Sequence, residues 1–195
     1  MIAMNRLLTP IIVLLFFVTI PTEAKNFPTE VRLEDTLAIA RVRNSIITKG
    51  IEACKTKDYS LAIQLLSTFL NSKRVVVSDR EIKGLSCLAL AYQMVGEPTQ
   101  ATNTITRAIS IANSKTIELA NLEYTAGIIA ERQNRKEIAV RHWEKARQLF
   151  LANNVTHKWA KITLDLAEQY RERGDIRKYR QLLEEHERAV AGNGI

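Results

Sequence analysis

The feature that most constrains this chain is a pattern that returns about every 40 residues. Small residues within apolar segments, at Gly50, Ala89, Gly127 and Ala167, lie 39, 38 and 40 positions apart (89 − 50, 127 − 89 and 167 − 127). The turn-forming residues Lys57, Gly96, Asn134 and Gly174 keep the same intervals. A fixed period of this length is typical of stacked helical units, each of which buries an apolar face against the next.

Each unit is predicted to consist of a helix, a short turn and a second helix. Gly96 and Gly174 stand where a helix would end in a left-handed residue, and Asn134 is the next most favourable residue for that conformation. Pro98 falls in the first turn of the following helix, where its missing N–H costs nothing. The turn chemistry therefore agrees with the spacing.

The helix-start signals and the composition also favour a helical fold. Ser78 and Glu81 form a capping-box pattern at the start of the second unit, and Thr156 or Asn154 is predicted to cap the first helix of the fourth. The chain of 195 residues has only seven glycines and four prolines, which favours long helices over sheets with tight turns. The predicted fold class is all-α, in one folded domain.

In these units the sequence resembles the tetratricopeptide-repeat (TPR) family in a long-period form, since the interval is nearer 40 than the usual roughly 34 residues. The signature positions are held by Leu88, Ala89, Tyr92, Ala101 and Ile105 in the second unit and by Leu166, Ala167 and Tyr170 in the fourth. The leading Trp and the closing Pro of the signature are absent. An unrelated helical bundle is the alternative, but it would not explain the recurring small residues.

The resemblance implies a right-handed α-solenoid of four TPR-like helical pairs. A partly helical lead-in is expected to precede them, with a helix that starts near Thr29 and either continues or breaks near Arg41 to Asn44. The expected segments are a lead-in at 25–42, helical pairs at about 43–77, 78–115, 116–155 and 156–191, and a flexible tail at 192–195.

Residues 1–24 are predicted to be a secretory signal peptide. Arg6 is followed by the largely apolar stretch Leu7–Ile20, and the segment ends in the small residue Ala24, so that a cleaved chain would begin at Lys25. The alternative is an uncleaved membrane anchor, although an apolar stretch of 14 residues (7 to 20) is short of the roughly 20 needed to span a bilayer. The protein is therefore expected to be exported, to the periplasm or the extracellular space.

The formal net charge of +7 is interpreted in that light. Because an exported protein does not meet nucleic acid, we expect no nucleic-acid partner, and contact with a membrane only if residues 1–24 are retained. Arg171, Arg177 and Lys178 could receive an acidic partner. The alternative is a solvated helix end that Glu172 and Asp175 partly balance.

The TPR resemblance also implies a groove lined by the first helix of each pair, in which a protein or peptide binds. An apolar lining suits an amphipathic helix or an extended apolar segment; alternatively, these residues only pack helix against helix, or the N-terminal stretch covers them. The family's clamp for a C-terminal carboxylate is not expected, because its positions hold apolar residues, Ser86 and Cys87. By alignment, the predicted binding residues are Ile47, Ile51, Cys54, Leu90, Met94, Tyr124 and Ile128.

Patterns for catalysis, cofactors and metals are absent from the sequence. His142, His157 and His186 lack the H-E-x-x-H spacing and a neighbouring cysteine set, and no phosphate-binding loop is present. The chain is therefore predicted to be an adaptor or scaffold for envelope proteins and not an enzyme, without a cofactor or metal. A membrane-tethered assembly factor is the alternative, and an exported hydrolase using Glu123 as its acid is a distant one.

The two cysteines are predicted to remain unbridged. Cys54 lies four positions after Gly50, whereas Cys87 lies two positions before Ala89. If the two helices run in equal register, this difference of six positions corresponds to about 9 Å along their axes. A disulfide tolerates a Cα separation of at most about 7 Å, so no intrachain bridge is expected.

Overall fold

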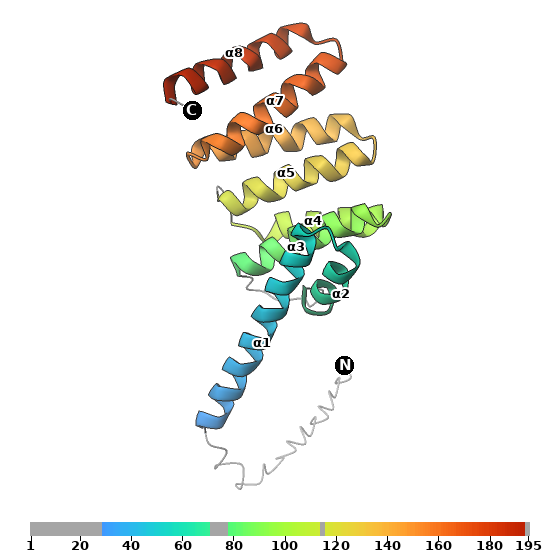
Figure 1. Ribbon diagram of the computed structural model, residues 1–195, viewed down its shortest axis with the longest axis vertical. Helices are drawn as coiled ribbons and strands as arrows, with labels where there is room; N and C mark the ends of the chain where they lie inside the picture. Colours follow the sequence, from blue (N-terminus) through green and yellow to red (C-terminus); the bar gives the residue numbers. More distant parts are fainter. Residues whose placement is uncertain (1–28, 71–77, 114–115, 194–195) are drawn as a thin grey trace, which may run out of the picture. The chain divides into compact units, whose positions relative to one another are not determined.

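The computed structural model describes residues 29–70, 78–113 and 116–193, which form α-helices joined by short turns (Figure 1). It divides into two units between Ala38 and Ile39, and of the first unit only the start of α1 is described. The predicted signal peptide lies outside the described residues. The helices are α1 (Thr29–Lys55), α2 (Tyr59–Leu70), α3 (Asp79–Met94), α4 (Pro98–Ile111), α5 (Ile117–Arg132), α6 (Lys136–Ala152), α7 (Thr156–Glu172) and α8 (Ile176–Asn193).

This helix order confirms the all-α solenoid of helix-turn-helix repeats. The first helix begins at Thr29, as predicted, and continues to Lys55 without the break that the sequence left open near residues 41–44. From α3 to α8 the helices follow one another as hairpins that stack in chain order (Figure 1).

The predicted turn residues adopt the conformation that stops a helix. Lys57, Gly96, Asn134 and Gly174 all have positive φ, at 65°, 88°, 59° and 77°. At the α3–α4 turn, the Glu97 N–H donates to the Tyr92 carbonyl at 2.8 Å, which is the closing hydrogen bond of a Schellman motif. The four corresponding turns therefore recur at the interval that the sequence predicts.

The N-terminal caps agree with the prediction at α3 but not at α7. Ser78 and Glu81 make the reciprocal hydrogen bonds of a capping box at the start of α3. At the start of α7 the prediction is wrong, because the N-cap is Val155 and no side chain caps the helix. Asn154 instead has φ 56° and ends α6, while Thr156 is the first helical residue.

The apolar core of the second unit consists of two clusters that meet at α5. Leu122, Ala126 and Ile129 of α5 belong to the cluster shared with α1–α4, whereas Ala120 and Ala130 belong to the cluster shared with α6–α8. Because α5 buries residues on both of its sides, each helical pair is stabilised by the next, as in other solenoids.

The recurring small residues mark close helix crossings. A Cβ added to Gly50 would lie 2.6 Å from Leu66 Cγ in α2, and one added to Gly127 would lie 2.1 Å from Trp143 Nε1 in α6. Ala89 and Ala167 are fully buried at the equivalent positions. The small residues of the sequence pattern are therefore required where the two helices of a pair touch.

Candidate protein-binding groove

The first helices of the four pairs line two adjoining hollows of about 260 and 150 Å³. Both hollows are lined by Asn121 and Lys158, so they adjoin at these two residues, and together they are called the groove below. The larger hollow is lined by Ile51, Ile82, Lys83, Ser86, Cys87, Glu118, Asn121, Leu122 and Lys158, and the smaller by Asn121, Tyr124, Phe150, Lys158 and Lys161.

The floor of the groove is apolar and rigidly packed. Leu122 and Phe150 have exposed fractions of 1%, and Ile82 has 5%, so only their edges face the groove. Ile51 is half-buried and adds apolar surface from α1. Because Leu122, Phe150 and Ile82 expose almost no surface, an apolar side chain of a partner would gain hydrophobic contact mainly with Ile51.

Three lysines stand around this floor. The Lys161 ammonium bonds to the Tyr124 hydroxyl oxygen and, at 3.0 Å, to Asp165; the Tyr124 bond is the main reason that its pKa is raised. Lys83 Nζ lies 3.7 Å from Glu118 Oε1. Two of the three positive charges thus have a carboxylate beside them.

Lys158 has different neighbours. Its ammonium donates to the Asn121 side-chain oxygen at 2.5 Å and lies 5.4 Å from the centre of the Phe150 ring. Among the described residues no carboxylate forms an ion pair with it, and the residue is half-buried. The centre of the groove therefore carries a positive charge that an amide and an aromatic face solvate but do not neutralise.

The predicted binding residues are divided between the groove and the core. Ile51 and Tyr124 line the groove. Ile47 and Cys54 have exposed fractions of 0% and 8%, so they are removed from the predicted contact surface. Ile47 belongs to the core because the next first helix, α3, packs over its side chain. The remaining three, Leu90, Met94 and Ile128, are half-buried and line neither hollow.

Several lining residues were absent from the predicted set. Lys158 lies three positions before Lys161, so both belong to one face of α7, which is a signal that the sequence contains. Phe150 belongs to a second helix and reaches the groove from beneath, which an alignment of first helices could not indicate. The alignment of first helices also predicts Lys83, Ser86, Asn121 and Lys161 as lining residues, and each of them lines a hollow. The other residues missed are Ile82, Cys87, Glu118 and Leu122.

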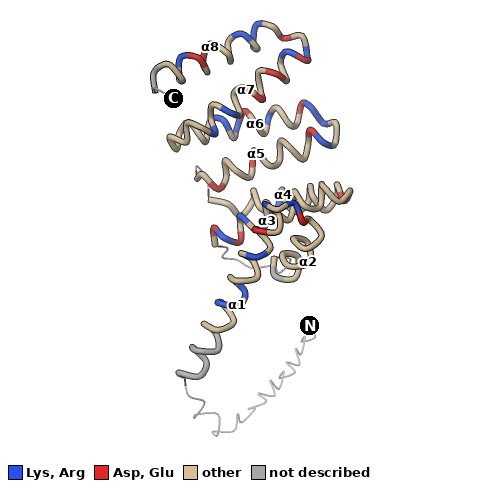
Figure 2. The backbone as a smooth tube through the Cα atoms, in the orientation of Figure 1, with Lys and Arg blue, Asp and Glu red and all other residues tan. Residues whose placement is uncertain are grey.

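Two of the three basic residues considered near the C-terminus make local contacts. Arg171 pairs with Glu168 on the same helix, and the Lys178 ammonium lies 5.6 Å from the centre of the Tyr170 ring. Arg177 is exposed. Figure 2 shows Lys and Arg distributed over several helices of the solenoid and interspersed with Asp and Glu. The net charge is therefore not gathered at this end of the chain.

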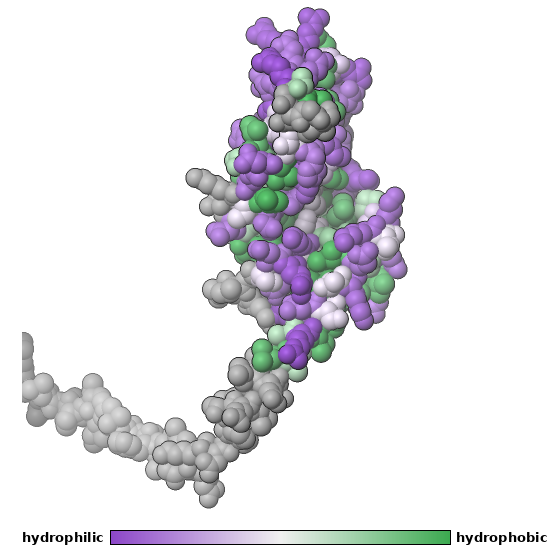
Figure 3. Space-filling model, turned by 60° about the vertical axis from the view of Figure 1, so that its left-hand side comes forward, coloured by the Kyte–Doolittle hydropathy of each residue, from purple (hydrophilic) through white to green (hydrophobic). Residues whose placement is uncertain are grey.

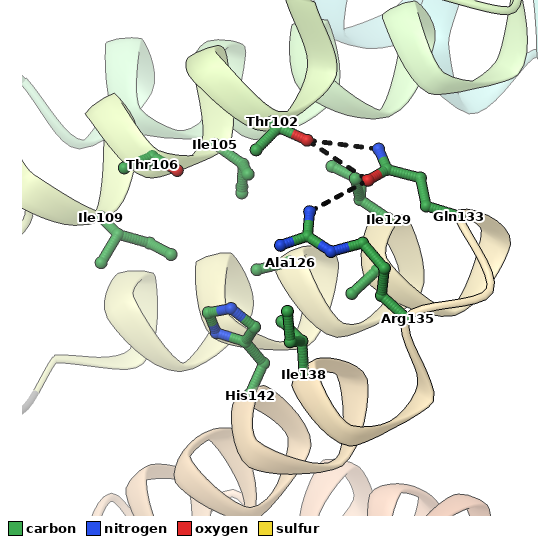
Figure 4. Close-up of a pocket in the computed structure, with 11 residues that line it drawn as sticks. Thr102, Ile105, Thr106, Ile109, Ala126, Ile129, Gln133, Arg135, Ile138 and His142 are labelled. Atoms are coloured by element: carbon green, nitrogen blue, oxygen red, sulfur yellow. Dashed lines mark hydrogen bonds between the residues drawn. The ribbon is translucent and has the colours of Figure 1, made fainter. Parts of the chain in front are cut away.

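A further hollow of about 100 Å³ lies between α4, α5 and α6 (Figure 4). Its polar residues bond with one another: the Gln133 side-chain oxygen accepts from Thr102 at 3.4 Å and from Arg135 at 3.3 Å. Figure 4 shows the Arg135 guanidinium and the His142 ring directed into the space that isoleucines surround. This hollow is small, and its hydrogen bonds connect α4 to the α5–α6 turn.

Glu123 is ion-paired and contacts His142, which lines this hollow. It is 1% exposed, and its carboxylate bonds to His142 Nδ1 at 2.6 Å and to Lys145. Burial favours the neutral form, but the bonds from His142 and Lys145 outweigh it and hold the Glu123 pKa below its usual value. A glycan-cleaving acid needs a raised pKa, so the geometry does not favour the hydrolase alternative. Within the described residues no group of three metal-binding side chains occurs.

The two cysteines are in contact, and the separation expected from the sequence is wrong. Cys54 Sγ donates to the Cys87 carbonyl oxygen at 3.5 Å. The assumption of equal register along α1 and α3 fails, because Arg43 pairs with Glu81 and Cys54 contacts Cys87, although these residues are 11 positions apart on α1 (54 − 43) and six apart on α3 (87 − 81). Gly50 contacts α2 within its own helical pair, so aligning it with Ala89 does not define the register of α1 against α3. Both cysteines are free thiols in this structure.

Comparison with known proteins supports the fold. A crystal structure of MamA matches with a TM-score of 0.58 and 18% identity, covering 76% of this chain and 81% of that chain. A MamA AMB-1 structure covers 80% of this chain and 93% of that one, with 17% identity and a TM-score of 0.40. No family model matches the sequence, and no curated protein matches it significantly. The fold and its groove thus define a TPR-like helical solenoid.

Two surface properties complete the description. In the part of the chain that the structure describes, no helix has the length and apolar content to cross a bilayer. On the face drawn in Figure 3, hydrophobic residues form small areas among hydrophilic ones.

Proposed function

We propose that this chain is an exported TPR-like adaptor that binds a segment of another protein in the groove. The observation that supports this most directly is the combination of an apolar floor, contributed by Ile51, Ile82 and Leu122, with the un-neutralised ammonium of Lys158. Such a surface gains free energy when an apolar side chain covers the floor and a carboxylate approaches the lysine. Binding, rather than catalysis, is the role that this arrangement supports.

The dimensions of the groove indicate the kind of occupant. Hollows of about 260 and 150 Å³ are smaller than typical pockets for whole small molecules, but they fit single side chains. The occupant is therefore an amphipathic helix or an extended segment that places apolar side chains over Ile82 and Phe150 and an acidic one near Lys158. The acidic side chain is an addition to the amphipathic helix or extended apolar segment expected from the sequence.

Export and envelope assembly belong to the same proposal. They are supported by the signal-peptide pattern of residues 1–24, and retention of that segment would instead make the chain a membrane-tethered assembly factor. N-terminal sequencing of the native protein separates the two: a start at Lys25 supports an exported adaptor, and an intact start at Met1 supports the tethered form.

Groove binding is tested by quantitative capture of partners from the native source. Ile51→Asp places a charge on the apolar floor, and Lys158→Glu reverses the central charge, so each should weaken binding by roughly 10-fold or more. Arg141→Glu makes the same charge reversal on exposed α6 and serves as the control. Unchanged capture by both groove variants, with native circular dichroism, would refute binding in the groove.

A further inference from the structure

The contact between Cys54 and Cys87 lies where the first two helical pairs meet. Cys54 is buried in the last turn of α1, and Cys87 is half-buried in α3 and lines the groove. The Cys54 thiol lies 3.5 Å from the backbone oxygen of Cys87. One sulfur thus lies directly beside the residue that carries the other.

The packing around the pair holds it in place. A Cβ built on Gly84 of α3 would lie 3.2 Å from Ile47 of α1, so the two helices approach closely about two turns before Cys54. Arg43 and Glu81 form an ion pair further along the same pair of helices. The side-chain interaction between the two cysteines lowers the pKa of Cys54 and raises that of Cys87, and a lowered pKa makes a thiol more readily the nucleophilic thiolate.

We propose that Cys54 and Cys87 form an intrachain disulfide that covalently joins α1 to α3. The oxidant is a low-molecular-weight disulfide such as oxidised glutathione. One protein thiolate attacks a glutathione sulfur and releases one glutathione thiolate. The second protein thiolate then attacks the protein sulfur of the mixed disulfide and releases the other. Two electrons pass to the oxidant, and the two thiol protons end on the released glutathione.

This cross-link goes beyond the proposed binding function and does not depend on it. It agrees with export, because disulfides persist in oxidising compartments. The bridge would close a loop of 33 positions. A loop of that size restricts the unfolded chain enough to raise the Tm by about 10 °C, and this effect is absent in the reduced protein.

The test uses the full chain, first reduced and then equilibrated with mixtures of reduced and oxidised glutathione. Peptide mass spectrometry without reduction is expected to find one cross-linked peptide that contains Cys54 and Cys87, with no thiol left to alkylate. Two alkylatable thiols across the whole range, or a persistent glutathione adduct on either cysteine, would overturn the proposal.

A displaced cysteine controls for non-specific pairing. The double variant Cys54→Ser with Lys55→Cys moves the thiol by one position to an exposed site. It should keep a glutathione adduct instead of bridging to Cys87, and it should show no rise in Tm on oxidation. If the displaced cysteine bridges as readily as Cys54, chain flexibility rather than the observed contact explains the bond, and the proposal fails.

Discussion

Replacing Gly127 by Ala tests whether the small residues of the repeat are required by helix crossing. A Cβ at this position would lie 2.1 Å from Trp143 Nε1 and 2.2 Å from Trp143 Cδ1, well inside van der Waals contact. The indole must therefore move. Its N–H at present donates to the Tyr124 carbonyl at 3.2 Å, so the movement also weakens a hydrogen bond.

The expected magnitude follows from opposing contributions. Ala favours the interior of a helix over Gly by about 1 kcal/mol. Overpacking in a close-packed core costs about 1–3 kcal/mol, and the lost hydrogen bond costs about 1 kcal/mol more. The net expectation for Gly127→Ala is a loss of about 1–3 kcal/mol in the free energy of unfolding, or a fall in Tm of roughly 3–10 °C.

Urea denaturation followed by circular dichroism measures this loss. A double-mutant cycle with Trp143→Leu identifies its cause, because removal of the indole should relieve the clash and make the two effects less than additive by at least about 0.5 kcal/mol. A Gly127→Ala protein more stable than wild type, or strictly additive effects, would refute the crossing argument.

Three other predictions concern polar groups in and near the core. Arg43→Ala leaves the buried Glu81 carboxylate without its ion-pair partner and should lower the free energy of unfolding, measured in urea, by about 3 kcal/mol. Lys55→Ala breaks an exposed pair and should lower it by less than about 0.5 kcal/mol. Equal losses would contradict the burial argument. The pKa of Glu123 in the folded protein lies below its ordinary 4.5, so the stabilisation from its ionised form is present above pH 4.5 and is lost as the pH falls through the folded pKa. The free energy of unfolding of Glu123→Gln should therefore depend less on pH in this acid range than that of the wild type. An unchanged pH dependence would count against the ion pairs. Burial, together with the hydrogen bond to Glu144, raises the pKa of Tyr170 to about 12. The stabilisation from the neutral phenol is therefore present below pH 10 and is lost as the pH rises through 12. An absorbance titration of Tyr170→Phe should lack this late ionisation, and if the ionisation persists it belongs to another tyrosine.

The sequence predicted the helical hairpins because their signals are local. Gly96 and Gly174 act through the φ of single residues, and Gly127 acts through one contact inside its own helical pair. These features repeat at fixed spacing and therefore reinforce one another. The wrong cap at Asn154 shows the limit, since the same residue type serves to start one helix or to end another.

The groove was less predictable because its residues meet across repeats. Lys158 and Asn121 are 37 positions apart, and their contact depends on how α7 lies against α5. The contact between Cys54 and Cys87 similarly depends on the register of α1 against α3, whereas Gly50 marks the crossing of α1 with α2 inside one pair. Ile47 looked suitable for binding because it is apolar on a first helix, but α3 covers it.

Site-specific photo-crosslinking in the native source tests the central claim most directly. A photoreactive residue is placed in the groove at Ser86 or at Asn121, and at the exposed position Thr106 on α4 as a control. The proposed function predicts that the same partner protein is cross-linked from both groove positions and not from Thr106. A partner captured from Thr106, with none from either groove position, would contradict it.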